Sequence, residues 1–216
     1  MKVGIDGVLL GAWADLGNAC RMLDIGTGTG LLALMAAQRS KALIDAVELE
    51  PNTAAEALLN FKNSKWHTRI SLSVCAFQEY ITAVKYDHIL SNPPFFEDSP
   101  RPANVRRAQA RHADSLNLEE LLEKSFPLLS ATGKISLVLP AASEERLRFL
   151  ARKNSLFINR FCRVSPDETK RPHRLMAELS KQAIPVAESG IIIRNAGSAA
   201  YTDQYRELTR EFYLAF

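Results

Sequence analysis

The residues Leu23-Asp24-Ile25-Gly26-Thr27-Gly28-Thr29-Gly30 are the clearest structural signal in this 216-residue sequence. Residues 22–25 form a short apolar run that predicts a buried strand, and residues 31–39 have the pattern of a helix. The glycines between them permit positive φ and let a ligand approach the backbone closely. Unpaired N–H groups at the start of the helix are suited to a carboxylate or a phosphate. The sequence therefore predicts a ligand-binding turn between a strand and a helix.

Apolar runs alternate with helical patterns through the rest of the chain. Further strands are predicted at residues 43–49, 70–75, 86–91, 134–139, 157–164, 175–180 and 190–194, and helices at residues 52–65, 118–129, 143–153 and 201–213. This alternation is typical of βαβ units and predicts an α/β fold with a parallel sheet. Residues 97–113 are expected to form a polar loop. No interior linker is evident, so we expect one domain over residues 1–216.

The composition limits the classes of function. Hydrophobic residues make up 47% of the chain, which is enough for one well-buried domain. No apolar stretch approaches the ~20 residues of a membrane helix. The three cysteines, Cys20, Cys75 and Cys162, are far apart and lack Cys-x-x-Cys spacing, so neither a zinc site nor a disulfide framework is indicated. We expect a cytoplasmic protein with reduced thiols, no metal and no membrane partner.

The spacing of the glycines points to a class of cofactor. A dinucleotide-binding fingerprint would need glycine where the chain has Leu31. The spacing is instead Gly-x-Gly-x-Gly with Asp24 before it, which resembles the first motif of class I S-adenosylmethionine-dependent methyltransferases. The resemblance implies S-adenosylmethionine as cofactor. It also implies a Rossmann-like, mostly parallel sheet, with an antiparallel strand near the C-terminus and helices on both faces.

A carboxylate at the end of the second strand, about 20 residues past the loop, is placed to accept both ribose hydroxyls. Glu48 fits the family pattern best, and Glu50 is the fallback. Many relatives have an acidic residue where this chain has Ala76, so we expect fewer polar contacts to adenine and a stacking role for Phe77. The residues predicted to bind the cofactor are Asp24, Gly26, Thr27, Gly28, Gly30, Glu48, Phe77 and Asn92.

The turn Asn92-Pro93-Pro94-Phe95 ends the strand predicted at residues 86–91, at the strand end where open α/β sheets bind ligands. It resembles the signature of amino-methyltransferases. The amine of adenine is a poor nucleophile, and the Asn92 side-chain oxygen and the Pro93 carbonyl are suited to accept its two hydrogens. The prolines stiffen the turn. Phe95, backed by Phe96, would stack on the base, a contact worth about 1–3 kcal/mol. The predicted catalytic residues are Asn92, Pro93, Pro94 and Phe95.

Three substrate classes share this turn: adenine in DNA, adenine or guanine in RNA, and the glutamine amide of a protein. Residues 1–14, Arg171-Pro172-His173-Arg174 and residues 205–214 resemble the matching segments of bacterial tRNA1(Val) adenine-37 N6-methyltransferases. This resemblance spans essentially the whole chain and implies methylation of adenosine 37 in tRNA. Relatives usually begin further upstream, so a short N-terminal segment is expected to be missing.

Two basic stretches, residues 101–112 and 152–174, are candidate contacts to RNA phosphates. His173 is expected to bind phosphate or to fix Arg174, because the chemistry needs no general base. The residues predicted to bind the substrate are Phe95, Phe96, Arg106, Arg107, Arg111, Arg171, His173 and Arg174. The expected partner is tRNA, bound by a monomer or a weak homodimer.

Two alternative functions stay open. A protein glutamine-amide methyltransferase acting on a release factor would share the turn but would not need the basic stretches. A non-catalytic protein that binds the cofactor or RNA is favoured only by Ala76 and the short N-terminus.

Overall fold

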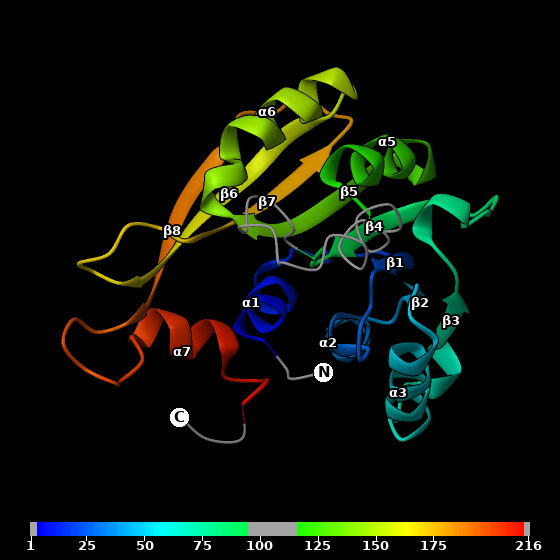
Figure 1. Cartoon of the computed structure of the whole chain (residues 1–216), viewed down its shortest axis with the longest axis horizontal. Helices are drawn as coiled ribbons and strands as arrows, with labels where there is room; N and C mark the ends of the chain where they lie inside the picture. The colour runs from blue at the N-terminus through cyan, green and yellow to red at the C-terminus, as the bar shows by residue number, and fades with distance from the viewer. Residues whose placement is uncertain (1–3, 95–115, 214–216) are drawn as a thin grey trace, which may run out of the picture.

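An eight-stranded sheet lies at the centre of the described residues, 4–94 and 116–213, of this computed structural model (Figure 1). The strand order is β3-β2-β1-β4-β5-β7-β6-β8. The strands are β1 Arg21–Ile25, β2 Leu43–Glu48, β3 Ile70–Val74, β4 Tyr86–Ser91, β5 Leu129–Pro140, β6 Phe157–Asp167, β7 Arg174–Ser180 and β8 Ala187–Arg194. Among them, β7 alone runs antiparallel to its neighbours, β5 and β6. The predicted sheet is thus confirmed.

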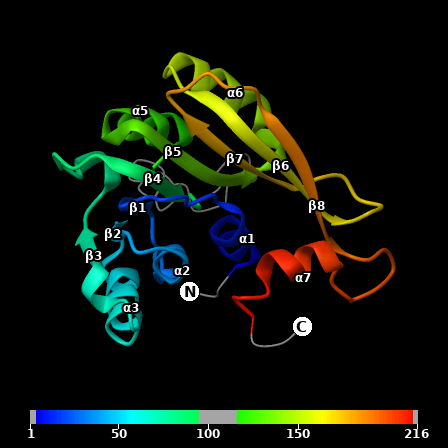
Figure 2. The same ribbon diagram turned by 180° about the vertical axis from the view of Figure 1, so that it is seen from behind.

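Helices cover both faces of the sheet, as predicted. They are α1 Ile5–Trp13, α2 Leu31–Arg39, α3 Pro51–Lys62, α5 Leu118–Leu128, α6 Glu144–Lys153 and α7 Asp203–Thr209, with short 3-10 turns at His67–Arg69, Phe77–Glu79 and Ala141–Ser143. Figures 1 and 2 show α1, α2, α3 and α7 on one face and α5 and α6 on the other. Successive side chains of β1 point to opposite faces, so Met22 joins one apolar core and Leu23 the other. The loop predicted at residues 97–113 lies outside the described residues.

Helix α1 was not predicted from the sequence. Its residues from Gly7 to Trp13 are all buried, so no polar face marks the helical period. Arg39 donates hydrogen bonds through Nη1 to the carbonyls of Gly11 (2.5 Å) and Ala14 (2.9 Å). These bonds give partners to backbone carbonyls at the C-terminal end of α1. A Cβ on Gly11 would lie 2.6 Å from the Sδ of Met35, so this glycine lets α1 approach α2 closely.

Buried charges and a buried histidine tie β4, β5, β6 and β7 together. Glu178 is 1% exposed and lies 3.2 Å from both Lys134 Nζ and Arg160 Nη1. His88 is also buried, and its Nε2 lies 2.8 Å from Ser136 Oγ. Burial lowers the pKa of His88 to about 3, assisted by the charge of Lys134. The imidazole is therefore neutral in the folded protein at neutral pH.

Candidate active site

The carboxyl ends of β2, β1 and β4 lie side by side at one edge of the sheet. Ile25 of β1 pairs with β2 on one side and with Ser91 of β4 on the other, and the Ser91 hydroxyl donates to the Ile25 carbonyl at 2.9 Å. Gly26, Glu48 and Asn92 each come one residue after this row of paired residues, Ile25, Val47 and Ser91. They therefore lie side by side, since adjacent strands are about 4.8 Å apart. The fold joins the glycine loop and the Asn-Pro-Pro turn into one site.

The glycine loop is folded back onto the end of β2. The N–H groups of Gly26 and Thr27 both donate to the Val47 carbonyl, at 2.9 and 3.0 Å. Gly28 donates through its N–H to Glu48 Oε2 at 2.8 Å. Gly26 has φ +68, and a Cβ on it would meet nothing within 4 Å. The space over Gly26 is therefore open to a ligand, as a cofactor site requires.

The structure distinguishes the two candidate carboxylates. Glu48 is half-buried, and its Oε1 accepts from the N–H of Glu50 at 3.0 Å while Oε2 accepts from the loop. Glu50 turns the other way and caps helix α3, accepting from the N–H of Asn52 at 3.2 Å. Two backbone donors thus fix the Glu48 carboxylate at the loop, which supports Glu48 over Glu50 as the ribose ligand.

Asp24 lies beneath the loop. It is fully buried, and its Oδ2 accepts from Thr27 Oγ1 at 2.5 Å and from the N–H of Ala33 at 3.0 Å. Within the described part of the chain its Oδ1 has no hydrogen-bond partner. Burial raises the pKa of Asp24 to about 7, against the lowering effect of the two hydrogen bonds. Asp24 therefore braces the loop against the first turn of α2, and its role in cofactor binding stays a prediction.

Gly30 has a packing role that the sequence analysis did not assign. It adopts φ +89 at the N-cap of α2, and a Cβ there would overlap the ring of Phe61, lying 2.8 Å from Cζ. Asn60, which neighbours Phe61 in helix α3, donates to the Thr29 carbonyl at 2.9 Å. Helix α3 thus packs directly on the loop, and Gly30 makes room for it.

Phe77 lies in the apolar core, where it is 4% exposed. Its ring stacks against Tyr80 with centroids 6.5 Å apart, and Lys124 Nζ lies 5.8 Å from its centroid. Little of the ring is therefore available to an adenine. Leu49, which follows Glu48, is 47% exposed and offers an apolar surface that the sequence analysis missed. An apolar residue directly after the strand-end acid is the signal that would have found it.

The Asn-Pro-Pro turn follows β4 directly. Asn92 is half-buried, Pro93 is buried and Pro94 is exposed. A Cβ on Gly7 of α1 would lie 3.9 Å from Asn92 Nδ2, so the first turn of α1 backs this side chain. The remaining predicted contacts in this region, Phe95, Phe96, Arg106, Arg107 and Arg111, lie outside the described residues.

The Pro-His-Arg motif begins β7 at the same edge of the sheet. The N–H and Nδ1 of His173 both lie within hydrogen-bond distance of the Val164 carbonyl, at 2.9 and 3.1 Å. Arg174 donates through Nε to Asp6 Oδ2 at 2.8 Å and through Nη1 to the His173 carbonyl at 3.1 Å. The His173 backbone carbonyl therefore helps to fix Arg174. Arg171 is exposed in the β6–β7 hairpin.

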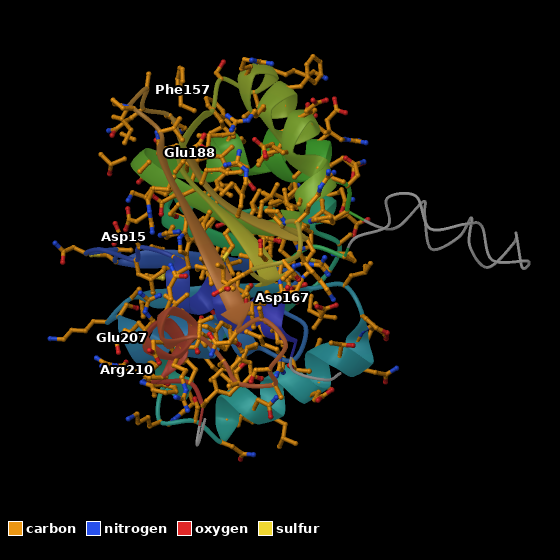
Figure 3. All side chains as sticks on the ribbon, turned by 90° about the vertical axis from the view of Figure 1, so that its left-hand side faces the viewer. Asp15, Phe157, Asp167, Glu188, Glu207 and Arg210 are labelled. Carbon is orange, nitrogen blue, oxygen red and sulfur yellow. The ribbon has the colours of Figure 1, made fainter. Side chains whose placement is uncertain are left out.

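That hairpin starts at Asp167, the last residue of β6, which is labelled in Figure 3. Because β6 is parallel to β8 and antiparallel to β7, its carboxyl end lies at the site edge. In the described residues, no helix is long and apolar enough to cross a membrane, and no group of three or more His, Cys, Asp or Glu residues could hold a metal ion.

The chain is similar to known methyltransferases. Residues 8–147 match the methyltransferase small domain family. The chain is 41% identical over 216 residues to the tRNA1(Val) (adenine(37)-N6)-methyltransferase of Parabacteroides distasonis, covering 99% of this chain and 91% of that protein. It is 43% identical over 215 residues to the protein of the same name from Vibrio parahaemolyticus, covering 99% and 89%.

Solved structures show the same fold. A structure described as a predicted O-methyltransferase from Agrobacterium tumefaciens has a TM-score of 0.73 at 18% identity, covering 95% of this chain and 96% of that one. One described as a putative class I S-adenosylmethionine-dependent methyltransferase from Listeria monocytogenes has a TM-score of 0.62 at 12% identity, covering 97% and 72%. At these identities the likeness concerns the fold alone.

Proposed function

The chain belongs to the methyltransferase small domain family and to that of the tRNA1(Val) (adenine(37)-N6)-methyltransferases, and we propose that it methylates the N6 amine of adenosine 37 in tRNA1(Val) with S-adenosylmethionine. One observation carries the proposal. Asn92 follows the strand pair Ile25–Ser91, so it lies beside Gly26 and the open space over the glycine loop. A hydrogen-bond acceptor for the amine thus neighbours the cofactor site.

The cofactor contacts follow from the loop. Bound S-adenosylmethionine supplies a methyl group on a positively charged sulfur. The Glu48 carboxylate, held by the Gly28 and Glu50 N–H groups, accepts the ribose hydroxyls with its remaining lone pairs. Leu49 provides the apolar surface beside the adenine, and Phe77 contributes the small part of its ring that is exposed. Gly26 leaves room for the ligand because it has no side chain.

The target amine is held by two acceptors. The Asn92 side-chain oxygen and the Pro93 carbonyl take its two hydrogens, which turns the nitrogen lone pair toward the space over Gly26. Phe95 and Phe96 supply the flat surface for the base, at about 1–3 kcal/mol per stacked base. No strong general base is required, because the proton becomes acidic once the methyl group is on nitrogen. Orientation and electrostatic fit therefore supply most of the rate enhancement.

Contacts to the rest of the tRNA come from basic residues around the site. Arg171 is exposed in the hairpin that follows β6, and His173 is held next to it by Val164. Arg106, Arg107 and Arg111, which lie outside the described residues, are further proposed phosphate contacts. With this substrate, the protein acts in the cytoplasm, as a monomer or a weak homodimer.

The test compares three substrates in one assay of labelled methyl transfer: tRNA from cells that lack this gene, a release factor and DNA. Label in tRNA alone is the expected result. Label in the release factor alone would establish the glutamine-amide alternative, and cofactor binding without transfer to any of the three would establish the non-catalytic alternative. Asn92→Ala should abolish transfer and leave cofactor affinity within about twofold, since Asn92 acts on the acceptor.

A further inference from the structure

An ion pair joins the first turn of α1 to the start of β7. Arg174 Nε lies 2.8 Å from Asp6 Oδ2, and the two side chains are 27% and 23% exposed. The sheet register places Arg174 opposite Pro140, the last residue of β5. Because β5 is parallel to β4, this end of β5 lies at the same edge as the Asn-Pro-Pro turn. The ion pair is therefore part of the rim of the site.

The arginine is the anchored member of this pair. Its Nη1 donates to the His173 carbonyl at 3.1 Å, and the N–H of His173 donates to the Val164 carbonyl at 2.9 Å. The His173 carbonyl also accepts from the N–H of Ala141 at 3.1 Å. The Arg174 guanidinium thus projects from a backbone that is bonded to β6 on one side and to the end of β5 on the other.

Within the described residues, the N-cap of helix α1 is Gly4, which has no side chain to cap the helix. The first turn of a helix frays when its N–H groups lack partners. The residue after Asp6 is Gly7, which meets the catalytic turn and α2: a Cβ there would lie 3.0 Å from Leu31 Cδ2 and 3.9 Å from Asn92 Nδ2. The first turn of α1 therefore lies between Arg174 and Asn92.

We propose that Arg174 is a positioning residue that acts through Asp6, holding the first turn of α1 against Asn92 so that its amide faces the target amine. This inference rests on the proposed function. Arg174 then affects the rate of methyl transfer, and other residues contact the tRNA phosphates. Displacing a catalytic group by 1 Å can lower the reaction rate about a hundredfold. Releasing one helical turn should displace Asn92 by less than this. We therefore expect kcat to fall about tenfold.

The experiment uses Asp6→Asn, Arg174→Gln and the double variant. Arg21→Gln is the control, because Arg21 pairs with Asp45 at 2.9 Å with similar exposure, 32% and 13%, but at the opposite end of β1. We measure kcat, KM for tRNA, its salt dependence, and hydrogen exchange of the α1 amides. Both single variants and the double variant should lose kcat to the same extent, with KM within about twofold, because coupled residues are not additive.

The α1 amides should exchange faster in Asp6→Asn and Arg174→Gln but not in Arg21→Gln. The inference is overturned if Arg174→Gln instead raises KM and lowers the salt slope by about one while Asp6→Asn keeps its kcat, because Arg174 then contacts phosphate. Unchanged exchange in α1 overturns it as well. Hydrogen exchange of the α1 amides can be measured whether or not the wild-type protein transfers a methyl group. An inactive wild-type protein would therefore show separately that the proposed function is wrong.

Discussion

Gly30→Ala tests the packing of helix α3 on the glycine loop. Gly30 has φ +89, a left-handed conformation that costs an alanine roughly 1–2 kcal/mol. The new Cβ would also overlap the ring of Phe61, at 2.8 Å from Cζ. Forcing an extra carbon into a packed contact costs about 1–3 kcal/mol. Together these two costs should lower the free energy of unfolding by about 2–5 kcal/mol. This is a large part of the ~5–15 kcal/mol by which an ordinary domain is stable.

Gly26→Ala is the matched control for this prediction. Gly26 also has positive φ, +68, but its Cβ would meet nothing within 4 Å, so only the backbone cost of about 1–2 kcal/mol applies. Urea unfolding followed by circular dichroism gives the free energy of unfolding of each variant. Adding Phe61→Leu to Gly30→Ala should restore part of the loss, since the clash is with the ring. Equal losses in Gly30→Ala and Gly26→Ala would refute the packing argument.

Three other perturbations give distinct readouts. Glu48→Gln should weaken S-adenosylmethionine binding about 10- to 100-fold in calorimetry, since hydrogen bonds to a charged group contribute about 1.5–3 kcal/mol; unchanged affinity would place the ribose contact elsewhere. Asp24→Asn should cost more stability at pH 5 than at pH 8. The raised pKa of Asp24, about 7, means that the folded protein holds this proton more tightly, so its contribution to stability is present at low pH and declines as pH rises toward 7. Urea titrations at both pH values measure the difference, and an equal cost at each would contradict the buried environment. Arg171→Gln should lower the logarithmic salt slope of tRNA binding by about one if Arg171 contacts a phosphate, and an unchanged slope would remove that contact.

The central sheet could be predicted because apolar runs that form strands alternate with helical patterns along the chain. Glu48 and Asn92 could be placed in one site because Glu48 ends one strand and Asn92 follows another, and the carboxyl ends of parallel strands meet at one edge. The antiparallel strand β7 was expected only from the resemblance to class I methyltransferases, since alternation alone predicts a parallel sheet.

Other features could not be predicted, because they depend on which residues meet in space. Helix α1 is buried from Gly7 to Trp13, so its sequence shows no amphipathic period. Asp6 and Arg174 are 168 residues apart, and no spacing rule connects them. Phe77 was expected to face the cofactor, but the 3-10 turn that begins at this residue directs its ring into the core.

We propose that the protein methylates adenosine 37 of tRNA1(Val), with the target amine held by the Asn92 turn. The most direct test incubates this tRNA, purified from cells that lack the gene, with labelled S-adenosylmethionine and the protein, followed by nuclease digestion and mass spectrometry. We expect N6-methyladenosine at position 37 with the wild type and none with Asn92→Ala, although that variant still binds the cofactor. Unmodified tRNA with the wild type, or equal modification by both proteins, would contradict it.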